Sequence, residues 1–216
     1  MDKVAVYYTC LTHDPVIELA CRKQLLKCNI PIVSVSRGKK IDFGDVRVVV
    51  EGEYGTITMF RQILAGCWQA KADFIFLCEN DVLYHHSHFD FSPVRNDMFY
   101  YNTHVWKVRY PDGHAVWTDD LQQMSGICVY RKLALDYFTE RVEQVERGEF
   151  NGHYEPNPRE NWQSKICNID IRHNKTLTKS KWSPNEFRNK KYAKGWKECD
   201  NVTGWENLFG DNLWQK

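Results

Sequence analysis

Short apolar runs of β-strand type alternate with helical patterns over the first 80 residues of the chain. Residues 3–10 form a continuous apolar run, which is typical of a strand buried in a parallel sheet. Asp14 and Pro15 then provide a helix N-cap and a first-turn proline, and apolar residues at helical spacing predict a helix over 14–28. This alternation predicts an α/β fold with a mostly parallel central sheet flanked by helices.

Further elements are expected from the same patterns along the rest of the chain. They are strands at 31–35, 46–50 and 73–78, a helix at 56–71, one or two strands within 98–110, a strand at 127–130, a helix at 132–147 and a strand at 167–171. The connections suit right-handed crossovers, so the carboxyl ends of the parallel strands should meet at one edge. Ligands of such sheets bind beyond that edge, where segments 9–13, 36–39 and 79–81 are expected to converge.

Length, charge and cysteine content narrow the class of protein. The 216 residues suit one large domain, and the net charge of +1 excludes a uniformly basic or acidic chain. The mean hydropathy is −0.58 and no apolar run approaches the roughly 18 residues of a membrane span. The start of the chain lacks a secretory signal pattern, and the eight cysteines are scattered without a Cys-x-x-Cys pair. These features predict a cytoplasmic protein with reduced, buried thiols and no membrane contact.

Two acidic residues end the strand expected at 73–78. Glu79 and Asp81 flank Asn80, so the strand would hold two carboxylates at a rigid sheet edge. Carboxylate oxygens suit Mg²⁺ or Mn²⁺, and such an ion completes its shell with substrate phosphates when few protein groups bind it. The alternative is a pair of solvated acids of the kind that strand ends often carry.

At this strand the sequence resembles nucleotide-sugar glycosyltransferases of the GT-A fold, in particular family 2. Their helix with Gly and Ala four residues apart, their aromatic-Ile strand and their Asp-x-Asp motif are matched at Gly66, Ala70, Phe74, Ile75 and Asp81. The sequence departs from the family at position 79, where Glu replaces the first Asp. The resemblance implies a nucleotide-diphosphate sugar donor such as a UDP-sugar, and Mn²⁺ or Mg²⁺ bound through Asp81, with Glu79 as a further ligand.

The resemblance extends to about residue 175. Residues 4–12 match the nucleotide-holding first strand and loop, residues 124–132 match the segment that lines the donor sugar and acceptor, and His173 follows a short strand as the family's late metal-binding histidine does. The residues that it assigns to the donor site are Thr9, Thr12, Ser36, Arg37, Arg61, Asn80, Ser125 and Gly126. For Arg61, the alternative is an ordinary solvated arginine on a helix.

An inverting member of this family uses a carboxylate as general base toward the acceptor hydroxyl. The segment around Glu160 resembles the family's acid-containing segment, so Glu160 is the expected catalytic base beside Asp81. Glu155 and Asp120 are alternatives, and without a positioned base the mechanism would be retaining. The histidines of 85–88 could suggest zinc, but neighbouring side chains on an extended segment point to opposite faces.

The segment from Arg172 to Lys197 holds nine Lys and Arg residues and one acid, giving +8 against −7 (+1 minus +8) for the rest of the chain. It also contains four aromatic residues, Trp182, Phe187, Tyr192 and Trp196. The pattern fits a nucleic-acid surface, a C-terminal cover with its lysines in water, or partners for a donor diphosphate.

We therefore expect a domain over 1–175 and a C-terminal extension over 176–216, packed on or beside the active site. The expected acceptor is a soluble compound with a hydroxyl group. The chain is also similar to small virus-encoded enzymes that add sugars to hydroxymethylated bases in DNA, and this resemblance implies such bases as acceptors. A nucleotidyltransferase and a non-catalytic nucleic-acid or sugar-binding protein are the alternatives. The sequence does not predict the sugar or the oligomeric state.

Overall fold

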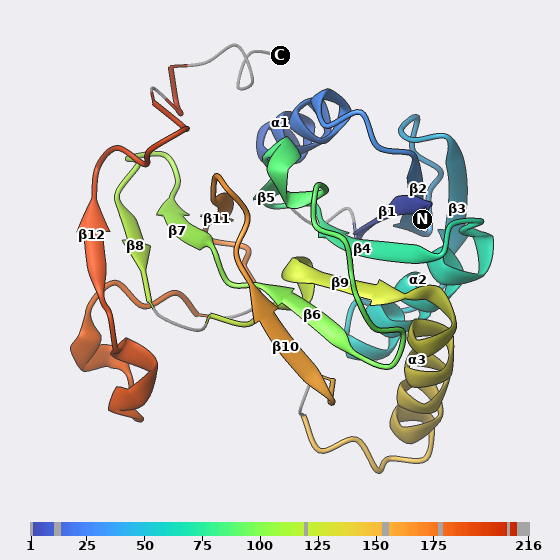
Figure 1. Ribbon diagram of the computed structural model, residues 1–216. Coiled ribbons are helices and arrows are strands. Elements are labelled where there is room, and N and C mark those ends of the chain that lie inside the picture. Colours follow the sequence, from blue (N-terminus) through green and yellow to red (C-terminus); the bar gives the residue numbers. More distant parts are fainter. Residues whose placement is uncertain are drawn as a thin grey trace.

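The structure is a computed structural model that describes residues 2–10, 14–118, 121–152, 156–176, 179–206 and 208–210. Its main sheet has seven strands in the order β10-β6-β9-β4-β1-β2-β3 (Figure 1). Every neighbouring pair is parallel except the two formed by β9, which runs antiparallel to β4 and β6. The strands are β1 (Lys3–Thr9), β2 (Ile32–Arg37), β3 (Val46–Val50), β4 (Phe74–Glu79), β6 (Phe99–Asn102), β9 (Ile127–Tyr130) and β10 (Arg159–Trp162). The α/β class and the largely parallel sheet are as the sequence predicts.

Helices cover both faces of this sheet. They are α1 (Pro15–Lys27), α2 (Thr56–Gln69) and α3 (Arg131–Glu146). Phe60 of α2 and Phe138 of α3 are fully buried in one core with alternate residues of β1 and β4. Leu25 of α1 lies in the core on the opposite face, together with residues of the segment after β4. Both cores depend on the residue alternation of the central strands.

Gly66 sets how closely α2 approaches the sheet. A Cβ at this position would overlap Cγ1 of Val6 on β1 and would lie 3.2 Å from Cγ2 of Val35 on β2. The helix therefore packs its backbone against the two central strands, and only glycine leaves the room.

A second sheet of five strands, in the order β12-β8-β7-β11-β5, stands beside the first. Its strands are β5 (Val82–Leu83), β7 (Val105–Arg109), β8 (Ala115–Trp117), β11 (Asn168–Arg172) and β12 (Lys197–Cys199). Its buried face packs Ile169 and Ile171 against Ile17 of α1 and against Trp205 and Leu208 near the end of the chain. The segment after residue 175 is thus joined to the second sheet through β12 and its core.

The sequence patterns located most elements of the main sheet to within two residues at each end, and Asp14 caps α1 as expected, its side chain accepting from the Val16 N–H. Four strands were not predicted: β5, β8, β10 and β12. The composition of residues 149–160, rich in Gly, Pro and Asn, predicts a loop, but Arg159 and Glu160 belong to the edge strand β10. No helix among the described residues is long and apolar enough to cross a bilayer.

Candidate functional site

The two sheets meet at the carboxyl end of β4. Tyr8 on β1 lies opposite Glu79, the last residue of β4, in the parallel register of the two strands. Asp81 lies two positions after Glu79, between β4 and β5. The short strand β5 then pairs antiparallel with β11, which places Asp170 opposite Val82. The Ile171 N–H also donates to the backbone oxygen of Asp81 at 2.8 Å.

We call Glu79, Asp81 and Asp170, with the adjacent Arg172 and His173, the acidic cluster. The Nη1 atom of Arg172 lies 3.3 Å from both carboxylate oxygens of Asp170. The Nε2 atom of His173 is 3.9 Å from Oδ2 of Asp81, and the two side chains are 3% and 10% exposed. Three carboxylates thus share a nearly dry site with one guanidinium and one imidazole.

Hydrogen bonds from surrounding elements orient these carboxylates. The Tyr8 hydroxyl donates to Oε1 of Glu79 at 2.8 Å, and the Gln123 amide donates to Oδ2 of Asp170 at 2.6 Å. The Gln123 amide oxygen is buried and has no hydrogen-bond partner among the described residues. Next to the cluster, therefore, the Gln123 side chain holds one acceptor oxygen that the described residues leave unsatisfied.

Burial and mutual repulsion both disfavour the charged carboxylates. Burial raises the pKa of Glu79 to about 6, with the Tyr8 hydrogen bond acting in the opposite direction. Burial, then Glu79 and Asp170, raise the pKa of Asp81 well above its usual value, and Arg172 partly opposes them. Such a group of like charges in low dielectric is stabilised by a bound cation.

The residues fit a divalent cation of the kind that a substrate helps to bind. Within the described ranges, no group of three or more His, Cys, Asp and Glu side chains is arranged to hold an ion alone. Two ligands bonded to Mg²⁺ at about 2.1 Å lie at most about 4.2 Å apart, and Asp81 and His173 are within that limit. The chemistry of the donors and the unsatisfied Gln123 oxygen also suit a hard cation.

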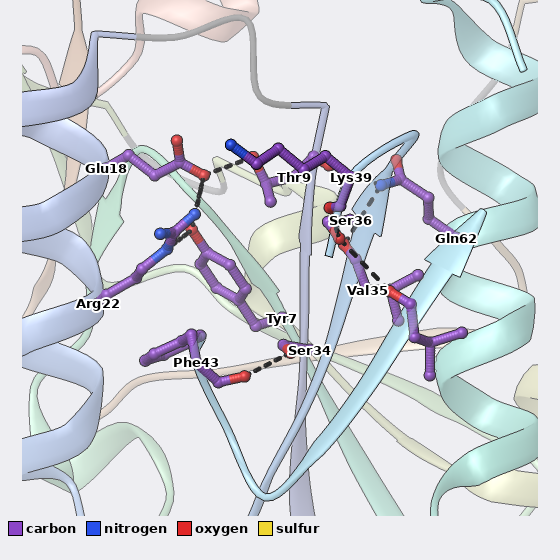
Figure 2. Close-up of polar contacts among 11 residues, drawn as sticks. Tyr7, Thr9, Glu18, Arg22, Ser34, Val35, Ser36, Lys39, Phe43 and Gln62 are labelled. Atoms are coloured by element: carbon purple, nitrogen blue, oxygen red, sulfur yellow. Dashed lines mark hydrogen bonds and ion pairs between the residues drawn. The ribbon is translucent and has the colours of Figure 1, made fainter. Parts of the chain in front are cut away.

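The carboxyl end of β1 is fixed by a buried polar network (Figure 2). Oε1 of Glu18 on α1 accepts from the Thr9 hydroxyl at 2.6 Å, from Nη2 of Arg22 at 2.6 Å and from the Tyr7 hydroxyl at 3.3 Å. Arg22 also donates to the Tyr7 oxygen at 3.2 Å. The Thr9 side chain is therefore bonded within the protein, and its contact with a nucleotide stays a prediction.

A second set of bonds joins the ends of β1, β2 and β3. The buried Gln62 amide on α2 donates to the backbone oxygens of Thr9 and Val35 at 2.7 and 3.2 Å. The Arg37 guanidinium donates to the backbone oxygens of Cys10 and Gly52 at 3.3 and 3.4 Å. The Ser36 hydroxyl donates to the Lys39 backbone oxygen at 2.5 Å. Ser36 and Arg37 lie at the predicted sheet edge, where they also shape the loops around it.

The segment with Ser125 and Gly126 lies directly against the end of β4. The Tyr84 hydroxyl donates to the Ser125 backbone oxygen at 3.1 Å and accepts from the Glu79 N–H at 2.9 Å, so one side chain joins the two segments. A Cβ on Gly126 would lie 2.9 Å from the backbone oxygen of Asn102. Asn80 is 5% exposed, and its Nδ2 atom has no hydrogen-bond partner among the described residues.

The structure places two predicted site residues apart from the acidic cluster. Arg61 forms an ion pair with Glu146 of α3, at 2.6 Å, on a partly exposed surface. Glu160 is exposed on β10 and lies opposite Tyr100, three strands from β4. Three strand spacings amount to about 14 Å. Their roles in donor binding and catalysis stay predictions that these positions do not support.

Three other expected residues, Thr12, Asp120 and Glu155, lie outside the described residues. The segment with the neighbouring histidines is not extended as the sequence argument assumed, because His86–His88 form a 3-10 helix and the rings of His85 and His86 lie 4.2 Å apart. His88 is fully buried whereas His86 is exposed, so the three histidines lie in different environments. All eight cysteines are free thiols.

Sequence reasoning missed Asp170, Arg172, Gln123 and Tyr8 as members of the site. The sequence Ile169-Asp170-Ile171-Arg172 did contain a signal. Because alternate residues of a strand share a face, an acid and an arginine between two isoleucines must lie on the side opposite the core. Gln123 and Tyr8 had no such signal, since only the fold brings them to the cluster.

No protein-family model matches the chain, and no curated protein matches it. Solved structures similar to it include nucleotidyltransferases and glycosyltransferases. The inositol-1-phosphate CTP transferase from T. maritima is 11% identical with a TM-score of 0.44, over 79% of this chain and 89% of that one. A glycosyltransferase involved in glycosylation of the major capsid of PBCV-1 is 9% identical with a TM-score of 0.44, over 76% and 82%. At these identities and TM-scores, the likeness gives no information on activity.

Proposed function

We propose that the protein is a divalent-cation-dependent glycosyltransferase that moves a sugar from a nucleotide-diphosphate donor to a hydroxyl acceptor. The observation that carries this proposal is the meeting of Glu79, Asp81 and His173 with Arg172 at the carboxyl end of β4. Carboxylates and an imidazole bind the cation, and a guanidinium beside them favours an anionic substrate. The edge of a largely parallel sheet is where α/β proteins bind nucleotides.

Asp81 and His173 would hold Mg²⁺ or Mn²⁺ together with oxygens of the substrate, and Glu79 as a third ligand stays a prediction from the sequence. The bound ion supplies positive charge that stabilises the departing nucleoside diphosphate. Arg172, which Asp170 holds in place through an ion pair, adds a fixed positive charge on the same side. Burial of both side chains keeps bulk water from weakening this charge.

The nucleotide would lie across the ends of β1 and β2. Arg37 and Ser36 border this edge, and the backbone of Thr9 is held there by Gln62. The Asn80 amide offers a buried donor that the described protein atoms leave unused, and such a donor favours a ligand oxygen. Gly126 permits close approach between its segment and the neighbouring strand, and with Ser125 it would border the donor sugar.

Inversion requires a base within hydrogen-bond reach of the acceptor hydroxyl. The sequence predicts Glu160, whose distance from β4 argues against direct contact with groups bound at the acidic cluster. Glu160→Gln tests this prediction directly. If Glu160 is the base, the substitution should lower kcat by about 100-fold or more. If Glu160 is only an exposed residue of the edge strand, kcat should be unchanged. Hydroxymethylated DNA bases as acceptors also remain a prediction.

Thermal unfolding with UDP, GDP, CDP and ADP, each with and without Mn²⁺, tests the donor site. A ligand that binds only the folded state raises the melting temperature, by an amount that grows with its concentration above Kd. We expect one diphosphate to stabilise the protein only with the metal present, and Asp81→Asn to remove that shift. The control is Asp73→Asn, which changes an exposed acid just before the other end of β4.

No shift with any diphosphate would contradict the proposal. A shift that Asp81→Asn leaves intact would place the metal elsewhere. Release of pyrophosphate from a nucleoside triphosphate, without turnover of any nucleotide sugar, would identify a nucleotidyltransferase instead.

A further inference from the structure

The second sheet has one polar face, opposite its apolar core. Asp170 and Arg172 alternate on β11 with isoleucines that are buried in that core. Lys107 and Arg109 on β7 lie opposite Asp170 and Arg172 in the parallel register, so they share the polar face. This face therefore begins at the acidic cluster and continues as a row of cationic side chains.

The basic segment that follows β11 is fastened to the same face. Nε of Arg172 donates to the Ser180 hydroxyl at 3.0 Å. The Arg109 guanidinium lies 5.2 Å from the ring centre of Trp182. Lys181 is near enough to Lys107 to lower its pKa, although burial of Lys107 is the larger cause. We call Lys107, Arg109, Arg172, Lys181 and Trp182 the basic aromatic face.

Acids within the chain pair with two cations of this face, the first being Arg172, which lies 3.3 Å from Asp170. Between residues 172 and 197 the only acid is Glu186, and its Oε2 atom accepts from the Trp182 and Ser183 N–H groups to cap a short helix. Asp112 does pair with Arg109, at 2.7 Å, on an exposed surface. The segment from Arg172 to Lys197, which contributes Arg172 and Lys181 to this face, carries +8 while the rest of the chain sums to −7 (+1 minus +8). This charge difference favours an anionic partner for the segment.

Aromatic rings lie among the cations. Trp182, Phe187 and Trp196 are each partly exposed, and the Lys181 ammonium is 4.4 Å from the Phe187 ring centre. Single-stranded nucleic acids bind to such surfaces, because bases stack on aromatic rings while cations contact phosphates. A lipid surface fits less well, because the exposed large apolar side chains of the described residues lie elsewhere: Leu19, Leu26, Val46, Val49, Tyr54, Trp68 and Val94.

We propose that the basic aromatic face binds a single-stranded nucleic acid and presents one of its hydroxyl groups to the acidic cluster as the acceptor of the transfer. The hydroxyl oxygen would bond to the anomeric carbon of the donor sugar while the bond from that carbon to the diphosphate breaks. The nucleoside diphosphate would leave with the bonding electron pair, and the hydroxyl proton would pass to a general base or to water. The inference rests on the proposed function, of which it names the acceptor class. The polar face of the second sheet runs from Asp170 to Arg109, and Trp182 lies against Arg109. A nucleic acid stacked on Trp182 would therefore lead toward the proposed cation site.

Fluorescence anisotropy of a labelled 20-nucleotide single-stranded DNA of mixed sequence tests the proposal with the full chain. We expect binding at low salt, with the logarithm of the association constant decreasing linearly with the logarithm of the salt concentration. The magnitude of that slope should fall by about 0.7 for each phosphate contact removed, as in Lys181→Ala. Trp182→Ala should weaken binding about tenfold, and Trp182→Phe should restore most of it. Lys27→Ala, an exposed lysine near the end of α1, is the matched control and should change neither quantity.

Competing probes separate a nucleic-acid site from a general anion site. Inorganic polyphosphate of equal charge should compete at least tenfold less well than the DNA, since it offers no bases. Equal competition by polyphosphate, an unchanged Kd in Trp182→Ala, or tighter binding to vesicles of phosphatidylserine and phosphatidylcholine would each overturn the proposal.

The metal-dependent increase in melting temperature with a nucleoside diphosphate tests the donor site separately from DNA binding. Trp182→Ala should keep that shift, which also shows that the variant folds. Loss of the shift in the unmodified protein, with DNA binding intact, would refute the acceptor role and the proposed function together. A normal diphosphate shift with no DNA binding would refute the inference alone.

Discussion

Burial of one neutral histidine should make the protein less stable in mild acid, where the same side chain binds a proton in the unfolded chain. Nδ1 of His88 lies 2.9 Å from the Asn102 amide nitrogen and 3.1 Å from the Asn168 amide nitrogen. Both amides are oriented by backbone donors, because the Asn102 oxygen accepts from the His104 and Ser164 N–H groups and the Asn168 oxygen accepts from the His85 N–H. Each therefore presents N–H to His88, so Nδ1 accepts and the ring is neutral.

Burial lowers the pKa of His88 from 6.5 to about 3. As pH falls below 6.5, the unfolded chain binds a proton at this position and the folded chain does not. The contribution of His88 to the free energy of unfolding is therefore fully present above pH 6.5. As the pH falls from 6.5 toward 3, this contribution decreases by about 1.4 kcal/mol per pH unit. Between pH 7 and pH 5 the loss from this one group is about 2 kcal/mol.

The variant His88→Gln keeps an acceptor for the two amides but cannot titrate. We expect its free energy of unfolding in urea to fall between pH 7 and pH 5 by about 2 kcal/mol less than that of the unmodified protein. All other titrating groups are common to both proteins and cancel. His86→Gln removes an exposed imidazole instead and serves as the control. Equal pH dependence of the unmodified protein and His88→Gln would refute the argument from burial.

Three further substitutions test how the helices hold the strand ends. Gly66→Ala should destabilise by about 1–3 kcal/mol, because the new methyl group overlaps Val6 and α2 must move off the sheet; urea unfolding measures this. Arg61→Ala should cost at most about 1 kcal/mol and leave diphosphate affinity unchanged, because its ion pair with Glu146 is partly exposed; a tenfold loss of affinity would instead restore it to the donor site. Glu18→Gln should lower stability by about 1–3 kcal/mol, because a buried carboxylate that serves three donors loses its charge; an unchanged urea midpoint would contradict this.

The central strands of the main sheet were predictable because β1, β2 and β4 are buried on both faces. Continuous apolar runs such as residues 3–9 leave few alternatives to a central parallel strand. The second sheet gave no comparable pattern. β5 has two residues and β8 and β12 have three each, which is too short for any periodicity to appear. β10 is an exposed edge strand with polar residues, so its sequence resembles a loop.

The same difference applies to the candidate site. Glu79 and Asp81 were predictable, since an apolar strand leads straight into them. The position of Glu160 depended on a strand pairing that only the tertiary structure defines, and the resemblance suggested a nearness to the cluster that the register of β10 with β6 does not provide. Local patterns identify the end of a strand, whereas distances between elements follow from their order in the sheet.

The pairing of β5 with β11 also determines when the site forms. Residues near these strands that contact each other, such as His85 and Asn168, are separated by 83 positions, so closing this loop costs considerable chain entropy. During synthesis from the N-terminus, Glu79 and Asp81 leave the ribosome well before Asp170 and His173. The nascent chain thus carries two strand-end carboxylates without their later partners, and the proposed cation site can be complete only when β11 docks. If the proposed function holds, activity would report that synthesis and folding have reached the last third of the chain.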